Sequence, residues 1–331
     1  MRTLISELIA WKFYLSQPEF DPISNRGEAM RSSLTAIIAA VVLAACSSSK
    51  SDHAPPESLA ATQADSARLI ASPGGFIQPE AVRYDPNQDR YFVSSWGKGD
   101  AGAKDNNGFI SRMVPDGAIE QLRFIAGGTG GVTLHAPRGL TIVGDTLWVV
   151  DADAVRGFNR RTGVPLATVD LSALKLGFLN DIAAGPDALY VTDTGTNRIY
   201  RIAGGRVSVA LEDLALGGPN GITWDARSRR FIVVPWDASV IKAWVPGSKT
   251  LTEVGRSGAT KFDGVEVLSG DRVLVSSQSD SSLHLFVGGT DRPIIRTGGA
   301  PADIAVDTKR NRTAVPFVDR NMVEIWPLPP Q

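Results

Sequence analysis

The stretch LNDIAAGPDALYVTDTGTNRIYRI, residues 179–202, determines the fold of this chain. Its apolar beginning is followed by a Gly-Pro-Asp turn at 185–187 and by an alternating segment, ALYVT, at 188–192. A polar DTGTN turn then leads into another alternating segment at 198–202. Gly, Pro, Asp and Asn supply the backbone dihedral angles that tight turns need, and alternation is typical of half-buried strands. The stretch therefore predicts a meander of three antiparallel strands.

The same pattern occurs six times along the chain. The copies begin at Pro79, Pro137, Leu179, Pro219, Phe262 and Pro301. After a longer first interval they follow one another about every 40 residues, and this period with three or four short strands per copy is typical of a β-propeller. The sequence therefore predicts an all-β protein, a six-bladed β-propeller.

The last copy is short of one strand. After Pro301 the chain has room for three strands, whereas an unmatched strand, residues 67–71, precedes the first copy. Pairing the two would leave no long open sheet edge. We therefore expect the N-terminal strand to complete the last blade and close the ring, and truncation past Arg68 to unfold the protein.

The composition is that of an ordinary globular protein. The net charge is −1, 43% of the residues are hydrophobic and 21% are charged. This balance argues against a basic nucleic-acid-binding surface and against a disordered chain. We expect a monomer without a nucleic-acid partner.

A targeting segment precedes the repeats. Met30 and Arg31 are followed by an apolar run at 34–45, which resembles a secretory signal and is too short to span a membrane. Residues 43–46, LAAC, also resemble the lipobox of bacterial lipoproteins, in which the cysteine becomes the lipidated first residue. Cys46 is the one cysteine of the chain, so it has no disulfide partner, and the competing interpretation is a free structural thiol. We expect a lipid on Cys46 to anchor the protein to a membrane.

The sequence divides into four segments. Residues 1–29 carry several acidic side chains, which is unusual in front of a signal, so we interpret them as an upstream extension and Met30 as the true start. Residues 30–45 form the lipoprotein signal peptide, 46–65 a flexible linker rich in Ser, Ala and Pro, and 66–331 the propeller. The expected location is a bacterial cell envelope, on the periplasmic side of the outer membrane.

The second residue of each copy carries the candidate chemistry. In a propeller the first strand of every blade lines the central channel, so these six positions form a ring at one mouth. They are Glu80, Arg138, Asn180, Asn220, Asp263 and Ala302. Four of them offer oxygen ligands, two as carboxylates and two as amides, and such a set suits a hard cation such as Ca²⁺.

An alternative explanation is that Asn and Asp occupy these positions only because turns favour them. Four oxygen ligands at one phase of the repeat speak against that explanation, because buried neighbouring carboxylates without a cation are costly. The lack of His and Cys in the ring argues against zinc. We expect a Ca²⁺ site made by Glu80, Asn180, Asn220 and Asp263, with Mg²⁺, Mn²⁺ and Zn²⁺ as open alternatives.

With this ring, residues 66–331 resemble the SMP-30/gluconolactonase/luciferin-regenerating-enzyme family, part of the calcium-dependent phosphotriesterase-like propellers. The resemblance rests on Glu80, Asn180-Asp181, Asn220-Gly221 and Asp263-Gly264, in that order. It implies that Glu80, Asn220 and Asp263 are direct metal ligands. It also implies that Asn180 is a ligand or contacts the substrate.

The resemblance implies metal-assisted hydrolysis of a lactone or related ester, with Asp263 as general base. The chain departs from the sugar lactonases at two places: Phe178 stands where an Arg often contacts substrate hydroxyls, and Ala81-Val82 replaces a common Gly-Pro. Gluconolactone is therefore disfavoured as substrate. The alternative function is a non-catalytic envelope binding or scaffold propeller with a structural ion.

Further residues are candidates for shaping the pocket. Arg138 and Trp96 are expected to contact substrate, although Arg138 could instead form a salt bridge with Glu80 or Asp263. Trp96 belongs to the long insertion 94–107, which is interpreted either as a lid or as a disordered loop. His135 and Asp303 lie close to ring positions, and the sequence leaves their roles open.

Overall fold

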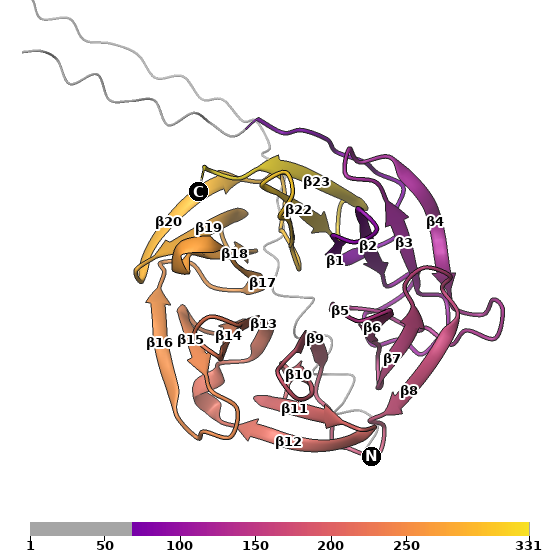
Figure 1. Ribbon diagram of the computed structural model, residues 1–331, viewed down its shortest axis with the longest axis horizontal. Helices are drawn as coiled ribbons and strands as arrows, with labels where there is room; N and C mark the ends of the chain where they lie inside the picture. Colours follow the sequence, from indigo (N-terminus) through magenta and orange to yellow (C-terminus); the bar gives the residue numbers. More distant parts are fainter. Residues whose placement is uncertain (1–67, 331) are drawn as a thin grey trace, which may run out of the picture.

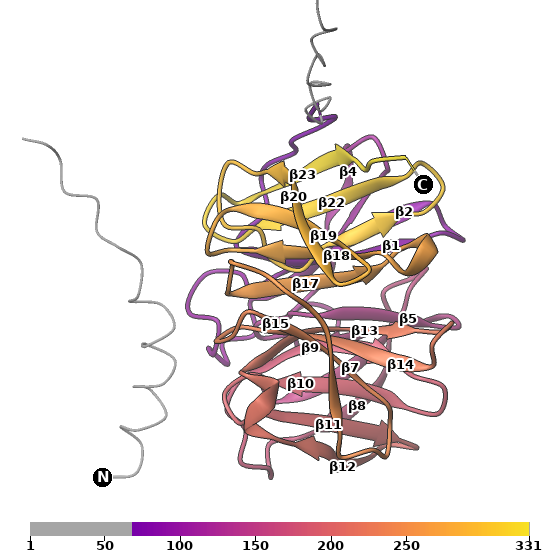
Figure 2. The same ribbon diagram turned by 90° about the vertical axis from the view of Figure 1, so that its left-hand side faces the viewer.

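The computed structural model describes residues 68–330. These form 23 β-strands and two short 3-10 turns, η1 (Leu214–Leu216) and η2 (Ser269–Asp271), but no α-helix. The strands make six antiparallel sheets around a central channel (Figure 1), and Figure 2 shows the same sheets from the side. The predicted six-bladed propeller is confirmed. The predicted upstream extension, signal peptide and linker, with Cys46, lie outside the described residues. No described helix is long and apolar enough to cross a membrane.

Each blade is an up-and-down sheet whose strand order follows the sequence, with the first strand innermost (Figure 1). Blades 1 to 3 consist of β1 (Pro79–Asp85), β2 (Arg90–Ser95), β3 (Phe109–Met113), β4 (Ile119–Ala126), β5 (Leu140–Val143), β6 (Thr146–Val150), β7 (Ala154–Asn159), β8 (Pro165–Asp170), β9 (Leu179–Ala184), β10 (Leu189–Asp193), β11 (Arg198–Ala203) and β12 (Arg206–Glu212). Blades 4 to 6 consist of β13 (Pro219–Asp225), β14 (Arg230–Pro235), β15 (Val240–Trp244), β16 (Leu251–Arg256), β17 (Phe262–Val267), β18 (Val273–Ser277), β19 (Ser282–Val287), β20 (Thr290–Arg296), β21 (Ala305–Asp307), β22 (Arg312–Phe317) and β23 (Met322–Pro327).

The hydrophobic core lies between the blades. Six clusters of buried apolar residues each join two neighbouring blades, and blade 6 shares one with blade 1. Between blades 3 and 4 the ring of Tyr190 lies 4.6 Å from that of Phe231 and 5.7 Å from that of Trp244. Each blade packs against a neighbouring blade on both faces, so its strands bury side chains on both sides of the sheet. This packing fixes the position of each inner strand at the channel.

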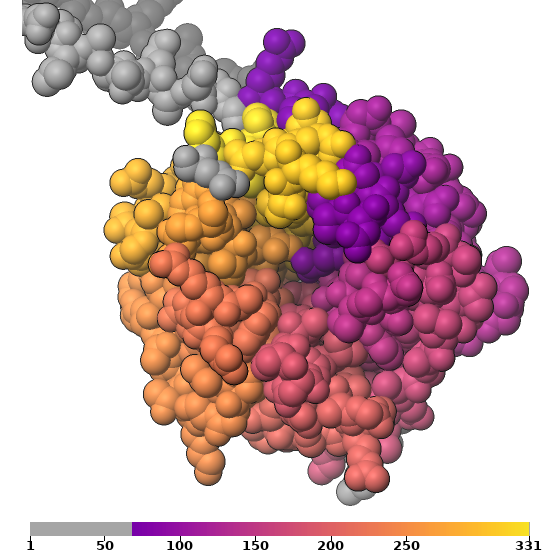
Figure 3. Space-filling view, in the orientation of Figure 1, coloured from indigo at the N-terminus to yellow at the C-terminus, as the bar shows by residue number. Residues whose placement is uncertain are grey.

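The ring is closed by the chain's own N-terminal segment. Blade 6 has three strands of its own, and residues 70–74 pair with its outer strand β23. The backbone N–H of Ile70 donates to the carbonyl of Ile325 at 2.8 Å, and that of Ile325 donates to Ala71 at 2.9 Å. The space-filling view shows the yellow C-terminal blade directly against the indigo first blade (Figure 3). The predicted closure is confirmed, although the pairing begins a few residues later than the predicted strand 67–71.

Removing residues 68–75 is expected to destabilise the propeller. The deletion breaks three backbone hydrogen bonds to β23, among them that from Val323 to the Pro73 carbonyl, and exposes an outer sheet edge. At roughly 0.5–1.5 kcal/mol for each bond, the expected loss is about 2–4 kcal/mol. Thermal melting of residues 66–331 and 76–331 measures it. Leu69→Ser is the control, because its side chain is exposed and its substitution leaves the hydrogen bonds intact.

Candidate functional site

In blades 1, 3 and 5 a buried hydroxyl on the second strand fixes the start of the inner strand. The N–H of Ala81 donates to Ser94 Oγ, that of Asp181 to Thr192 Oγ1, and that of Gly264 to Ser276 Oγ, at 2.8–2.9 Å. The strand register shifts at the same point in these blades, so a bulge there directs the ring side chain out of the sheet.

The same hydroxyls also tie neighbouring blades together. Thr192 Oγ1 donates to the Asn220 carbonyl at 2.6 Å, and Ser276 Oγ donates to the Ala302 carbonyl at 2.8 Å. A glycine after the ring position permits this close approach. A Cβ on Gly221 would lie 2.1 Å from the carbonyl oxygen of Asp263, which no side chain tolerates. The inner strands therefore hold the ring residues in a fixed arrangement.

All four predicted oxygen ligands are buried, and two of them have an oxygen atom that accepts no hydrogen bond. Glu80, Asn180, Asn220 and Asp263 are between 2% and 6% exposed. Glu80 Oε2 and Asn220 Oδ1 have no hydrogen-bond partner, and neither does the nearby Asp303 Oδ2. Buried acceptors normally have a partner, so these atoms are suited to binding a positively charged group. The donor set therefore fits a hard cation.

The two other predicted ligands are oriented by neighbouring side chains. Asn180 Nδ2 donates to Thr194 Oγ1 at 3.1 Å, which occupies the amide nitrogen and leaves the amide oxygen as the available acceptor. Gln278 Nε2 donates to Asp263 Oδ2 at 2.6 Å. In residues 68–330 no three His, Cys, Asp or Glu side chains come close enough to hold a metal ion, and the predicted set has two such residues together with two amides.

The carboxyl groups of the channel are poorly solvated and repel one another. Burial raises the pKa of Glu80 well above its ordinary value, and the charge of Asp263 adds to this effect. Burial raises the pKa of Asp263 to about 7, and that of Asp181 to about 6. Burial and the charge of Asp181 also raise the pKa of Asp303. At neutral pH such a cluster either keeps protons or binds a cation.

Without metal, the protein is expected to lose stability as the pH rises. Because the folded-state pKa of these groups is raised, their contribution is complete below about pH 4 and is lost as pH passes through about 6 for Asp181 and about 7 for Asp263. Asp263 alone contributes on the order of 4 kcal/mol. The melting temperature in EDTA should therefore fall from pH 5 to pH 8, and saturating Ca²⁺ should remove most of the decline. A flat profile in EDTA would contradict the buried cluster.

Arg138 is held by backbone carbonyls rather than by an acid. Its guanidinium donates to the carbonyls of Leu179, at 2.8 Å, and Ala101, and it stacks on the ring of Phe178 at 3.9 Å. It forms no ion pair among residues 68–330, so the predicted salt bridge to Glu80 or Asp263 is not formed. Burial lowers the pKa of Arg138 to about 10 against the opposing charge of Glu80. Its Nε remains without a partner and can donate to a ligand.

The insertion 94–107 is an ordered loop. Asn106 accepts from the Leu134 N–H at 2.8 Å through Oδ1, and its own N–H donates to His135 Nδ1 at 3.0 Å. The loop also supplies the Ala101 carbonyl to Arg138. His135 thus acts as a hydrogen-bonded loop residue, and these contacts tie the insertion to the segment before blade 2. Trp96, at the base of the loop, has a buried indole Nε1 without a hydrogen-bond partner.

Several channel residues have no counterpart in the predicted ring. Asp181 and Asp303 each follow a ring position by one residue, in blades 3 and 6. Asp181 accepts from the Ile222 N–H at 2.8 Å and so fixes the next blade. Three residues after the ring positions of blades 1 and 5, Arg83 and Glu266 form an ion pair across blade 6. The sequence places an arginine and a glutamate at equivalent positions of two blades, and these opposite charges could have indicated the pair.

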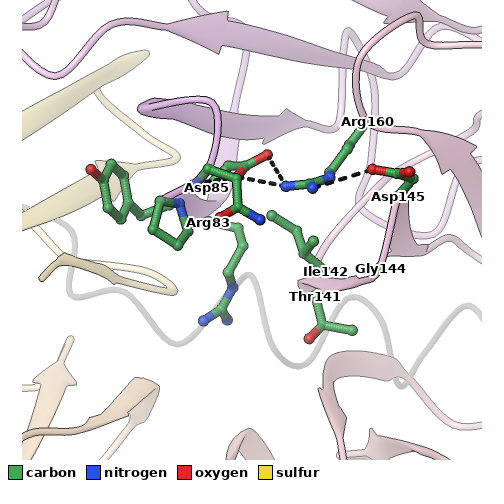
Figure 4. A pocket seen from close by; sticks show the side chains of 10 residues that line it. Arg83, Asp85, Thr141, Ile142, Gly144, Asp145 and Arg160 are labelled. Carbon is green, nitrogen blue, oxygen red and sulfur yellow. Dashed lines mark hydrogen bonds and ion pairs between the residues drawn. The ribbon is translucent and has the colours of Figure 1, made fainter.

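Two clefts open towards the other end of the inner strands. One has a volume of about 510 Å³, and Figure 4 shows Arg160 between Asp85 and Asp145 at its wall. The other, of about 250 Å³, is lined by Ile182 and Trp224 among others, and both clefts include Arg83. Arg160 is bonded to Asp85 at 2.7 Å and to Asp145 at 3.2 Å, so its charge is already compensated. The oxygen ring does not line these clefts.

Comparison with known proteins gives structural matches alone. No family model and no curated protein matches the chain. A gluconolactonase from Xanthomonas campestris is similar at 16% identity, with a TM-score of 0.59, over 81% of this chain and 96% of that chain. A catalytically inactive virginiamycin B lyase from Staphylococcus aureus, determined with quinupristin, is similar at 13% identity and a TM-score of 0.54, over 78% and 99%. A streptogramin B lyase is similar at 12% identity, with a TM-score of 0.57, over 78% of this chain and 96% of that chain. At these identities the likeness establishes the propeller fold.

Proposed function

We propose that this chain is a calcium-dependent hydrolase of a lactone or related ester. The observation that carries the proposal is the buried ring in which Glu80 Oε2 and Asn220 Oδ1 lack donors while the pKa of Asp263 is raised. The gluconolactonase similarity supports a lactonase-type activity at the level of the fold. The similar lyases have the same architecture, so the fold alone does not decide the chemistry.

Glu80, Asn220 and Asp263 would hold the cation, and Asn180 would complete the set or contact substrate. When bound, Ca²⁺ supplies Lewis-acid polarisation of the substrate carbonyl. These side chains are buried, and electrostatic interactions are stronger in such surroundings than in bulk water. Mg²⁺, Mn²⁺ and Zn²⁺ are the alternative ions, and the oxygen-only set favours calcium.

Asp263 is the proposed general base. Its Oδ2 accepts from Gln278, which leaves Oδ1 to take a proton from the attacking water. Without a cation, burial raises the pKa of Asp263 to about 7. A bound cation would lower that pKa and so keep the carboxylate ionised to act as a base at neutral pH. After the ester bond breaks, the same carboxyl returns the proton to the departing alkoxide oxygen. Asp263 thereby carries the proton in both directions.

Arg138 and Trp96 are the proposed substrate contacts beside the ring. Arg138 offers Nε and a guanidinium face stacked on Phe178, and Trp96 offers its unpartnered indole N–H. Phe178 is apolar where a sugar lactonase often has an arginine, so we propose a substrate with fewer hydroxyl groups than gluconolactone. We further propose that Cys46 carries a lipid that holds the protein at the periplasmic side of the outer membrane of a bacterium.

A calcium titration of residues 66–331 tests the proposal, combined with thermal melting and a panel of small lactones and aryl esters. Calcium binding together with calcium-dependent hydrolysis is the expected result. Binding that raises the melting temperature without turnover would instead favour a scaffold propeller in which the ion is structural. Absence of divalent-ion binding would contradict both functions.

A further inference from the structure

In the three blades that supply Glu80, Asn220 and Asp263, the residue two positions before the ring residue has a left-handed backbone conformation. The φ angles there are 52° at Gln78, 68° at Gly218 and 50° at Lys261. Glycine adopts such angles readily, whereas a residue with a side chain does so at a cost. Strain of this kind persists at functional sites, so a lysine at this position calls for a role of its side chain.

The residue after the second strand faces the ring mouth. In blade 3 this residue is Thr194, which contacts Asn180, and in blade 5 it is Gln278, which contacts Asp263. In blade 4 the equivalent residue is Trp236, whose N–H donates to the carbonyl of Gly218 just as that of Thr194 donates to Phe178. The repeat therefore places Trp236 at the same mouth.

Lys261 lies against this tryptophan. Its ammonium group is 5.8 Å from the centre of the Trp236 ring, and its backbone is hydrogen-bonded to Trp236 at 2.9 Å and to Gln278 at 3.0 Å. Both side chains are half-buried. Lys261 forms no ion pair with a carboxylate in the part of the chain that the structure describes. Its ammonium group therefore lies against Trp236, Lys261 precedes Asp263 by two residues, and no carboxylate of the described residues neutralises its charge.

We propose that Lys261 and Trp236 form an anion-recognising subsite, so that the substrate is a lactone or ester bearing an anionic group, a carboxylate or a phosphate. The proposal rests on the hydrolase function and specifies its substrate class. The ammonium donates to the anion, and the indole beneath it holds the lysine stem in place. The strained backbone at Lys261 is retained because glycine would lose this donor.

Isothermal titration calorimetry tests the subsite with three probes: 5-oxotetrahydrofuran-2-carboxylate, its neutral carboxamide and inorganic phosphate. Titrations are made with EDTA-treated protein, so that the proposed calcium-dependent hydrolysis does not consume the lactone probe. The wild type should bind the carboxylate about tenfold to a hundredfold more tightly than the carboxamide, which is the effect of one hydrogen bond to a charged group. Lys261→Met should reduce this ratio to about one without changing the carboxamide affinity. Lys261→Arg should retain it, as should Lys249→Met on the exposed control lysine.

A second variant separates this role from folding. Lys261→Gly relieves the positive φ, so its melting temperature should equal or exceed that of the wild type while the preference for the anion is lost. Phosphate binding that depends on Lys261 would identify phosphate as an accepted anion. If the wild type prefers the carboxylate probe but does not bind phosphate, the recognised anion is a carboxylate. A preference that persists in both Lys261→Met and Lys261→Gly, or is missing in the wild type, would overturn the subsite. Binding is measured without turnover, so absence of hydrolysis alone would count only against the proposed function.

Discussion

Asp263→Ala is expected to reduce lactone or ester hydrolysis by about 10²–10⁴-fold and to weaken calcium binding at least about tenfold. The substitution removes the proposed base and one of the two carboxylate ligands. It also leaves the amide of Gln278 without its acceptor at 2.6 Å. Because the pKa of Asp263 is raised, its removal should not lower the stability of the metal-free protein at pH 8. Calorimetric calcium titration, steady-state kinetics and melting at pH 8 in EDTA measure these three effects.

The control for this variant is Asp271→Ala, which removes an exposed carboxylate in η2, between β17 and β18 at the opposite end of the blade from the ring. Asp271 pairs with Arg227, and both side chains are more than half exposed. Its substitution should leave calcium affinity and kcat unchanged. Unchanged calcium affinity in Asp263→Ala would remove the basis of the metal assignment, whereas lost activity with intact metal binding would leave Asp263 a base that is not a ligand.

Arg83→Met is expected to destabilise the propeller by about 3–5 kcal/mol at pH 8, because it leaves Glu266 buried without its partner. The Arg83 and Glu266 side chains are 18% and 15% exposed, and the guanidinium also donates to the Leu140 carbonyl at 2.7 Å. Burial already raises the pKa of Glu266 against the opposing charge of Arg83. Once Arg83 is absent, Glu266 can take a proton, so the loss should be smaller at pH 5. Denaturant unfolding at the two pH values measures it.

The double variant Arg83→Met/Glu266→Met completes the comparison. Two apolar side chains of similar length should restore most of the stability, since neither leaves a buried charge. The exposed pair of Arg227 and Asp271 provides the matched reference, and Arg227→Met should change the free energy of unfolding by less than about 1 kcal/mol. A double variant as unstable as Arg83→Met would mean that the two charges do not stabilise each other.

Periodicity made the fold predictable, because each blade repeats one pattern of turns and alternating strands. It also brought together Glu80, Asn220 and Asp263, since residues at one phase of a closed repeat must meet at one mouth. The same periodicity places Arg83 and Glu266 at equivalent positions of blades 1 and 5, but it does not determine which residues at these positions form a pair.

The hydrogen bonds of individual side chains could not be predicted from the sequence pattern. The sequence could place Arg138 in the ring, but not its bonds to the carbonyls of Leu179 and Ala101, because a guanidinium has many partners of similar energy. Asp303 likewise lay one residue from a predicted position. Its burial and unpartnered oxygen follow from the packing of blade 5 against blade 6, where Gly264 leaves space for it.

The pairing of residues 70–74 with β23 has a consequence for the order in which the protein matures. The ring cannot close before Ile325 has been synthesised and has met a segment made about 250 residues earlier. Contacts of such long sequence separation form late and slowly. Glu80 and Asp263 therefore take up their final separation only after β23 has joined the ring, and a product truncated before β23 lacks the closed oxygen ring as well as that strand.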